Sequence, residues 1–199
     1  LGEYPSRLLV TWKPSGEGNL HVKPISSSDL VVRALSKRAT RGTATIAGFT
    51  VLCALGRSGL VPAALKREGD GTTPIGCFPV RYVLYRPDRG RRPRTVLPLR
   101  HLRSDDGWCE RPDDRHYNQL VRLPHASVTD RMWRGDHLYD VVMVIGHNDR
   151  PRLHARGSAV FIHLARPGFL PTAGCIAFNR RDLARVLARL TRRSRVVVV

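Results

Sequence analysis

The sequence lacks the signals of several protein classes. None of its four cysteines belongs to a C-x-x-C pair, which argues against a zinc ribbon. No apolar run approaches the roughly 18 residues that a membrane-spanning helix needs, and the longest, residues 46–55, is expected to form strand. No internal repeat, domain linker or export signal is visible. The 199 residues are therefore expected to form one domain, residues 1–199, without a transmembrane segment.

Acidic residues are scarce as well. The chain has 16 Asp and Glu against 34 Lys and Arg, which gives a formal net charge of +18. A surface of this charge attracts polyanions such as nucleic acid, anionic lipid or an acidic polymer. No helix-turn-helix, RNA-recognition or zinc-finger signature accompanies the charge, so no specific nucleic acid is expected as a partner. The alternative is a solvated arginine-rich surface with no dedicated partner.

Hydrophobic periodicity predicts a mostly β (α+β) domain. Strands are expected over residues 8–12, 20–25, 78–85, 141–146, 158–163 and 196–199, and a hairpin over residues 43–55 with its break at Gly48. Alternation within the third of these strands predicts a single shared face for Phe78, Val80, Tyr82 and Leu84. Cys53 and Cys77 lie in apolar runs and are expected to be core thiols, although two disulfides are formally possible.

One or two helices are expected, and the clearest begins after Asn179. Asn179 has the side chain of an N-cap, and Asp182 stands at the third helical position, as in a capping box. Apolar residues follow at helical spacing: Leu183, Val186, Leu187 and Leu190. Residues 86–135 are expected to form a long irregular insertion, and its aromatic residues favour an ordered segment that covers a substrate.

The segment 161–179, F-I-H-L-A-R-P-G-F-L-P-T-A-G-C-I-A-F-N, has the residues of a nucleophilic site. His163 ends a strand, a short Pro/Gly loop follows, and Cys175 precedes the predicted helix. A catalytic cysteine needs a base, hydrogen-bond donors for the oxyanion, and exposure. His163 is the candidate base, Gly174 allows a tight backbone turn, and the nearby helix start is expected to favour the thiolate.

This arrangement resembles the L,D-transpeptidase (YkuD-type) catalytic domain, whose signature is a His followed by [Ser/Thr]-x-Gly-Cys. Thr172, Gly174 and Cys175 match the signature, and His163 matches the upstream His. A second family motif, T-P-x-G-x-[F/Y], matches residues 73–78, and the resemblance covers residues 66–190. Only eight residues separate His163 from Thr172, and Ala173 and Ala177 replace common family residues. The chain therefore resembles a divergent subfamily with a short His-to-Cys loop.

The resemblance implies a β-sandwich or barrel, an enzyme without cofactor or metal, and peptidoglycan peptide stems as substrate. The Cys175 thiolate would form a thioester with the diaminoacyl residue of one stem and release D-Ala. An amine of a second stem would then complete a 3–3 or 1–3 cross-link. The Leu164 carbonyl is the candidate that orients His163. Such a substrate implies a location in the cell envelope or periplasm.

The candidate residues for substrate binding come from single positions and not from a motif. Arg166 follows His163 by three positions and is the candidate for binding a stem carboxylate. The other candidates for the cleft are Thr172, Trp108, Tyr139 and Asn148. Two alternative functions stay open: a hydrolytic L,D-carboxypeptidase or amidase relative, and a non-catalytic binder of an anionic polymer or nucleic acid. A metal site at His147, His154 and His163 is not expected, because compact ligand spacing is missing.

Overall fold

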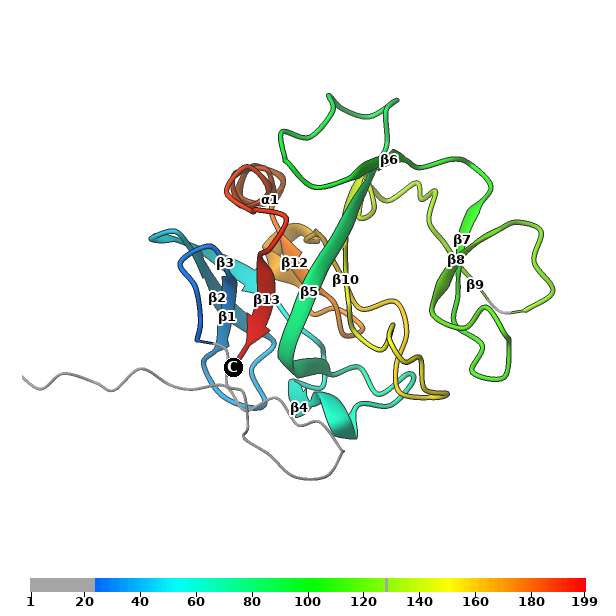
Figure 1. Ribbon diagram of the computed structural model, residues 1–199, viewed down its shortest axis with the longest axis horizontal. Helices are drawn as coiled ribbons and strands as arrows, with labels where there is room; N and C mark the ends of the chain where they lie inside the picture. Colours follow the sequence, from blue (N-terminus) through cyan, green and yellow to red (C-terminus); the bar gives the residue numbers. More distant parts are fainter. Residues whose placement is uncertain (1–23, 128) are drawn as a thin grey trace, which may run out of the picture.

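A closed β-barrel forms the centre of the structure, a computed structural model that describes residues 24–127 and 129–199 (Figure 1). Its wall runs in the order β10-β11-β12-β3-β2-β1-β13-β5, and pairing between β5 and β10 closes the ring. The strands of the wall are β1 Leu30–Ala34, β2 Arg41–Ile46, β3 Phe49–Ala54, β5 Thr73–Tyr85, β10 Val141–Ile145, β11 Phe161–Leu164, β12 Ile176–Phe178 and β13 Arg195–Val198. The mostly β fold and the barrel are therefore confirmed.

The long strand β5 links several parts of the barrel. Its first half pairs with β13 and its second half with β10. Two short strands pair with it where its long neighbours leave an edge open, β4 Leu60–Pro62 opposite β13 near its start and β6 Leu99–His101 opposite β10 near its end. The expected start at residue 78 is therefore too late, because the T-P-x-G motif is already part of the strand.

A change of register within β5 overturns the expected shared face. The pairing with β10 shifts between Val144 and Ile145, so one residue of β5 has no opposite partner. Phe78, Val80 and Val83 pack in the barrel core, whereas Tyr82 and Leu84 belong to a second apolar cluster. The prediction of one face was wrong because a bulge reverses the side on which each following residue points.

The expected hairpin and helix are both present. Strands β2 and β3 form the hairpin, and positive φ angles of 47° at Ala47 and 73° at Gly48 make its turn. The helix α1, Arg180–Leu187, begins after Asn179, whose side chain accepts a hydrogen bond of 2.8 Å from the Asp182 N–H. Two 3-10 helices complete the helical elements of the described residues, η1 Ala63–Leu65 and η2 Pro167–Phe169. The apolar face of α1 packs into the barrel core through Leu183, Val186, Leu187 and the following Leu190.

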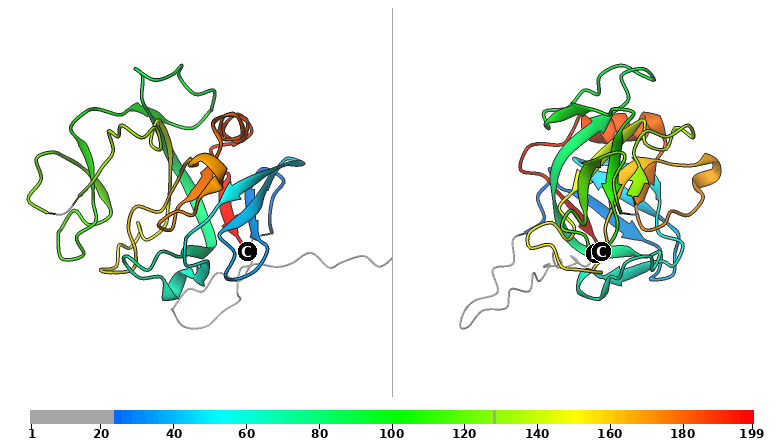
Figure 2. Two further views of the ribbon diagram at one scale, coloured as in Figure 1. Left: turned by 180° about the vertical axis from the view of Figure 1, so that it is seen from behind. Right: turned by 90° about the vertical axis from the view of Figure 1, so that its right-hand side faces the viewer.

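A second sheet lies to one side of the barrel, as Figures 1 and 2 show. It has the order β8-β7-β9 and consists of β7 Asp106–Cys109, β8 Gln119–Arg122 and β9 Thr129–Arg131. The insertion 86–135 is therefore less irregular than expected, because strands of three or four residues are too short to produce a visible period. The second apolar cluster lies between this sheet and the outer face of β5, β10 and β11, and it contains Trp108, Phe161 and Cys175.

The remaining expectations concern the N-terminal strands, two of the cysteines and the lack of a membrane-spanning helix. The strand expected over residues 8–12, and most of that over 20–25, lies outside the described residues, while Pro24 and Ile25 are in no strand. Cys53 is fully buried, as expected, whereas Cys77 on β5 is only partly buried. Within the described ranges, no helix has the length and apolar character that crossing a membrane requires.

Candidate active site

The loop that ends in Cys175 is fixed to the chain segment that follows β3. The Thr172 N–H donates to the Leu55 carbonyl at 2.9 Å, and the Arg57 N–H donates to the Thr172 carbonyl at 2.8 Å. The Thr172 hydroxyl then donates to the Cys175 carbonyl at 2.6 Å and accepts from the Gly174 N–H at 3.1 Å. The short loop is therefore rigid at the point where it presents the thiol.

His163 and Cys175 face the same side of two neighbouring strands. His163 lies in β11, which pairs in parallel with β12, and its partner in the register is Ala177. Cys175 lies two residues before Ala177, and residues two apart in an extended chain point to the same face. Both side chains are buried and line one cavity of about 360 Å³.

The hydrogen bond of His163 defines its tautomer. Its Nδ1 lies 2.8 Å from the Leu164 carbonyl oxygen. Because a carbonyl oxygen only accepts, Nδ1 must hold the proton, and the lone pair of the neutral ring is on Nε2. Burial lowers the pKa of His163 to about 4, so the ring is neutral at pH 7. His163 therefore has the protonation state of a general base, and the contact expected for Leu164 is present.

The Cys175 thiol is also neutral in the resting structure. Burial raises its pKa to about 12, and the hydrogen bond from the Phe161 N–H at 3.3 Å acts in the opposite direction. The thiol itself donates to the Ala159 carbonyl at 3.1 Å. The expected help from a helix start is missing, because strand β12 separates Cys175 from α1 and such effects fade within about one turn. Attack by Cys175 therefore requires transfer of its proton to a base.

Tyr139 packs beside this pair. Its ring makes an edge contact with His163 at 5.3 Å between centroids, and its hydroxyl donates to Asp130 at 2.7 Å. Tyr139, Arg166 and Thr172 all line the cavity, so the structure brings these three predicted residues together with Cys175 and His163. Gly174 is buried directly before the thiol, and Leu164 contributes its carbonyl.

Trp108 and Asn148 are not among the residues that line this cavity. Trp108 packs behind the site, edge to face on Phe161 at 4.8 Å, and its indole N–H donates to Asn118. Asn148 shapes a turn instead, with a φ of 47° and a side-chain amide that donates to the Leu153 and Gly157 carbonyls. For these two residues the structure shows packing and turn roles.

Three charged residues of the cavity were not identified from the sequence: Arg57, Asp130 and Arg134. Arg134 forms ion pairs with Asp136 and Asp130 at 2.5 and 3.3 Å. The spacing of Asp130 and Arg134, four residues apart beside Trp133, was an available signal for this pair. Arg57 had no such signal, because a single arginine after a strand looks like any solvated charge.

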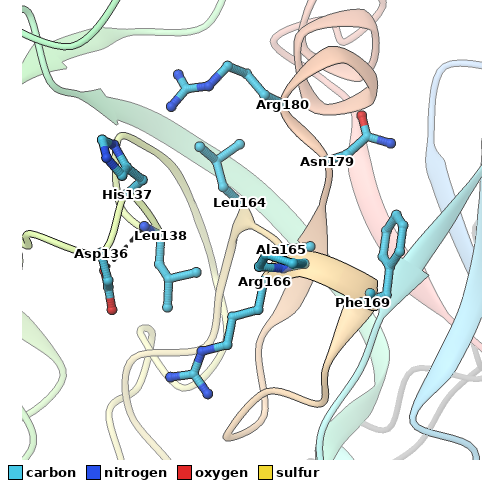
Figure 3. Close-up of a pocket in the computed structure, with 11 residues that line it drawn as sticks. Asp136, His137, Leu138, Leu164, Ala165, Arg166, Phe169, Asn179 and Arg180 are labelled. Carbon is cyan, nitrogen blue, oxygen red and sulfur yellow. Dashed lines mark hydrogen bonds between the residues drawn. The ribbon is translucent and has the colours of Figure 1, made fainter.

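A second cavity of about 600 Å³ adjoins the first, and Leu138 and Arg166 line both (Figure 3). Residues 164–169 of the short His-to-Cys loop form one wall, and residues 136–138 form another. Within the described ranges, the Arg57 and Arg166 side chains form no ion pair with an acidic residue. The charge of Arg166 also helps to lower the pKa of Asp136 in the adjoining cavity, and both guanidinium groups can still donate hydrogen bonds to a carboxylate.

One group of side chains among the described residues has donor atoms suited to a metal ion. The ligand atoms of Cys109, Asp114 and His125, in the second sheet and its loops, lie within 4.8 Å of one another. However, the Asp114 carboxylate already accepts hydrogen bonds from the His116 N–H and the Ser127 hydroxyl. These contacts explain its position without an ion. The group does not include His147, His154 or His163.

Comparison with known proteins agrees with this geometry. The family model of the L,D-transpeptidase catalytic domain, YkuD, matches residues 30–198, from the first strand of the barrel to the last. No curated protein and no solved structure matches the chain. Since the family match spans nearly the whole chain, this protein belongs to the YkuD family of L,D-transpeptidase catalytic domains.

Proposed function

We propose that the protein is a cysteine-dependent L,D-transpeptidase that cross-links peptidoglycan peptide stems in the cell envelope. The observation that supports this most is that a neutral His163 and the Cys175 thiol line the same cavity. The Nε2 lone pair of His163 is free to take a proton, because Nδ1–H is held by the Leu164 carbonyl. A buried cysteine with such a base is suited to acyl transfer.

In the proposed reaction, His163 Nε2 takes the thiol proton while Cys175 Sγ attacks the carbonyl carbon of the diaminoacyl residue. The tetrahedral intermediate then breaks its bond to D-Ala, and the His163 imidazolium returns the proton to the leaving amine. The thioester that remains is attacked by an amine of a second stem. His163 takes the proton of this amine, the new amide forms, and the thiol regains its proton.

The charges around the site support a substrate with carboxylates. Arg57 and Arg166 line the cavity, and each offers a fork of N–H donors, although the charge of Arg166 also acts on Asp136. The adjoining cavity shares Arg166 and gives room for a second peptide branch (Figure 3). We assign Arg166 to the stem carboxylate, and Thr172 and Tyr139 to the walls of the site.

Incubation with purified tetrapeptide muropeptides, followed by mass spectrometry, tests the proposal. Wild-type protein should release D-Ala and produce a dimer, and fragmentation of the dimer distinguishes a 3–3 from a 1–3 linkage. Cys175→Ala should keep the fold and lose all of this activity. A tripeptide monomer as the only product would indicate hydrolysis, and unchanged muropeptides would favour a non-catalytic binder. Activity that survives in Cys175→Ala would refute the assignment of the nucleophile.

A further inference from the structure

A single buried hydroxyl connects the two sequence motifs of the protein. Thr73 begins β5 and is fully buried. Its hydroxyl oxygen accepts the Gly56 N–H at 2.8 Å, and its proton is donated to the Gly174 carbonyl at 3.0 Å. Because the Gly56 N–H approaches the oxygen as a donor, the hydroxyl proton has only the carbonyl of Gly174 as its acceptor in this arrangement. The direction of this hydrogen bond is therefore fixed.

The Gly174 carbonyl shares a peptide group with the Cys175 N–H. The cis peptide bonds found in the described residues precede Pro124 and Pro151, so the peptide between Gly174 and Cys175 is trans. In a planar trans peptide the C=O and N–H bonds point in opposite directions. By holding the carbonyl toward the start of β5, Thr73 turns the Cys175 N–H to the opposite side.

The next peptide is held in the same manner. The Thr172 hydroxyl donates to the Cys175 carbonyl at 2.6 Å, so hydroxyl groups fix the peptides on both sides of the nucleophile. The space behind Gly174 is closed as well, because a Cβ atom there would lie 2.8 Å from the Thr72 carbonyl oxygen. The orientation of the Cys175 N–H is thus determined by the β5 motif and not by the cysteine loop alone.

We propose that Thr73 is a positioning residue, which directs the Cys175 N–H toward the oxyanion that forms when the thiol attacks a carbonyl. The inference rests on the proposed acyl transfer by Cys175. In that step the C–S bond forms, the carbonyl π electrons move to oxygen, and the N–H of the attacking residue is a backbone donor beside the reacting carbon. Such a donor has its effect only on reactions that pass through an oxyanion. Thr73 itself does not touch the substrate.

The reaction rates of Cys175 with two electrophiles distinguish this role from a purely structural one, in which Thr73 only holds the loop in place. A p-nitrophenyl ester acylates the thiol through an oxyanion, whereas iodoacetamide alkylates it by displacement and forms none. Thr73→Val keeps the shape of the side chain and removes the hydroxyl, and Thr73→Ser keeps the hydroxyl. We expect acylation of Cys175 to slow by about a hundredfold in Thr73→Val and alkylation to change by less than about threefold, with acylation near the wild-type rate in Thr73→Ser. Thr73→Ala is measured in parallel, in case the valine variant does not fold.

An equal loss of acylation and alkylation in these variants would overturn the inference, because it would mean that Thr73 only holds the loop. Unchanged acylation in Thr73→Val or Thr73→Ala would overturn it as well. Acylation and cross-linking by the wild-type protein distinguish a failure of this inference from a failure of the proposed function. If the ester acylates Cys175 and the hydroxyl matters as expected, but muropeptides are not cross-linked, the transpeptidase proposal fails and the role of Thr73 stands. If the wild-type thiol is not acylated, both fail.

Discussion

At the scale of the residue, Gly174 is a position beside the thiol where a side chain is poorly tolerated. Its φ is +141°, and a Cβ atom would meet the backbone oxygen of Thr72 at 2.8 Å. Gly174→Ala should therefore destabilise the protein by about 2 kcal/mol through backbone strain. It should also slow muropeptide cross-linking by about a hundredfold, because a shift of the neighbouring Cys175 by about 1 Å is enough for that loss. Urea unfolding and product analysis measure the two effects.

Gly135→Ala is the matched control for this substitution. Gly135 lies in an exposed loop, and a Cβ atom there has no heavy atom within 4 Å. Its stability and activity should stay near the wild-type values, since nothing has to move. If Gly174→Ala were as well tolerated as Gly135→Ala, the tight contact between Gly174 and the Thr72 carbonyl oxygen would be wrong.

Single residues also show how far the sequence predicts the site. His163, Thr172 and Cys175 could be identified because they lie close together in one segment and form a recognisable pattern. Arg57 could not, because it reaches the cavity only through the closure of the barrel. Trp108 was assigned to the cleft as an aromatic residue in a loop, but apolar burial against Phe161 determines its position.

At the scale of the element, the capped helix α1 allows a clean test. Asn179 accepts a hydrogen bond from the Asp182 N–H at 2.8 Å and donates one to its carboxylate at 2.6 Å. Asn179→Ala removes both contacts and should lower the free energy of unfolding by about 1 kcal/mol. Arg181→Ala, in the same exposed turn, should change it by no more than about 0.5 kcal/mol. Urea denaturation compares the two, and equal effects would show that the cap contributes nothing.

The helix was predicted correctly, whereas the face of β5 and the small sheet were not, because only the helix has signals that are local in the sequence. The signals for α1 are local, because a cap residue and an apolar stripe lie within one short segment. The face of β5 was wrong because the bulge opposite Val144 and Ile145 depends on a partner strand about sixty residues away in the sequence. The small sheet of the insertion was missed because β7, β8 and β9 have only three or four residues each. Long-range pairing of this kind leaves little trace in a single sequence.

At the scale of the whole molecule, buried titratable groups make stability depend on pH. Burial lowers the pKa of both His147 and His163 from 6.5 to about 4. Between these pH values the unfolded chain binds two more protons at these positions, so they make stability rise with pH. Glu110 acts in the opposite sense, because burial raises its pKa from 4.5 to about 7 and the folded protein keeps its proton. For these three groups the sum is about one net proton taken up on unfolding near pH 5.

This balance predicts how stability changes with pH and how two substitutions alter the change. One net proton corresponds to about 1.4 kcal/mol per pH unit, so these groups should make the wild-type free energy of unfolding rise at about that rate near pH 5. The slope should then fall off toward pH 6.5, where the unfolded histidines lose their protons. His147→Gln should flatten the slope, because it leaves one histidine against Glu110. Glu110→Gln should roughly double it, because both histidines then act unopposed. Urea unfolding at half-unit pH steps measures each slope. If the two variants change the slope in the same direction, the buried, neutral state of His147 or of Glu110 is wrong. The same experiment on His163→Gln would show whether His163 is neutral in the folded protein.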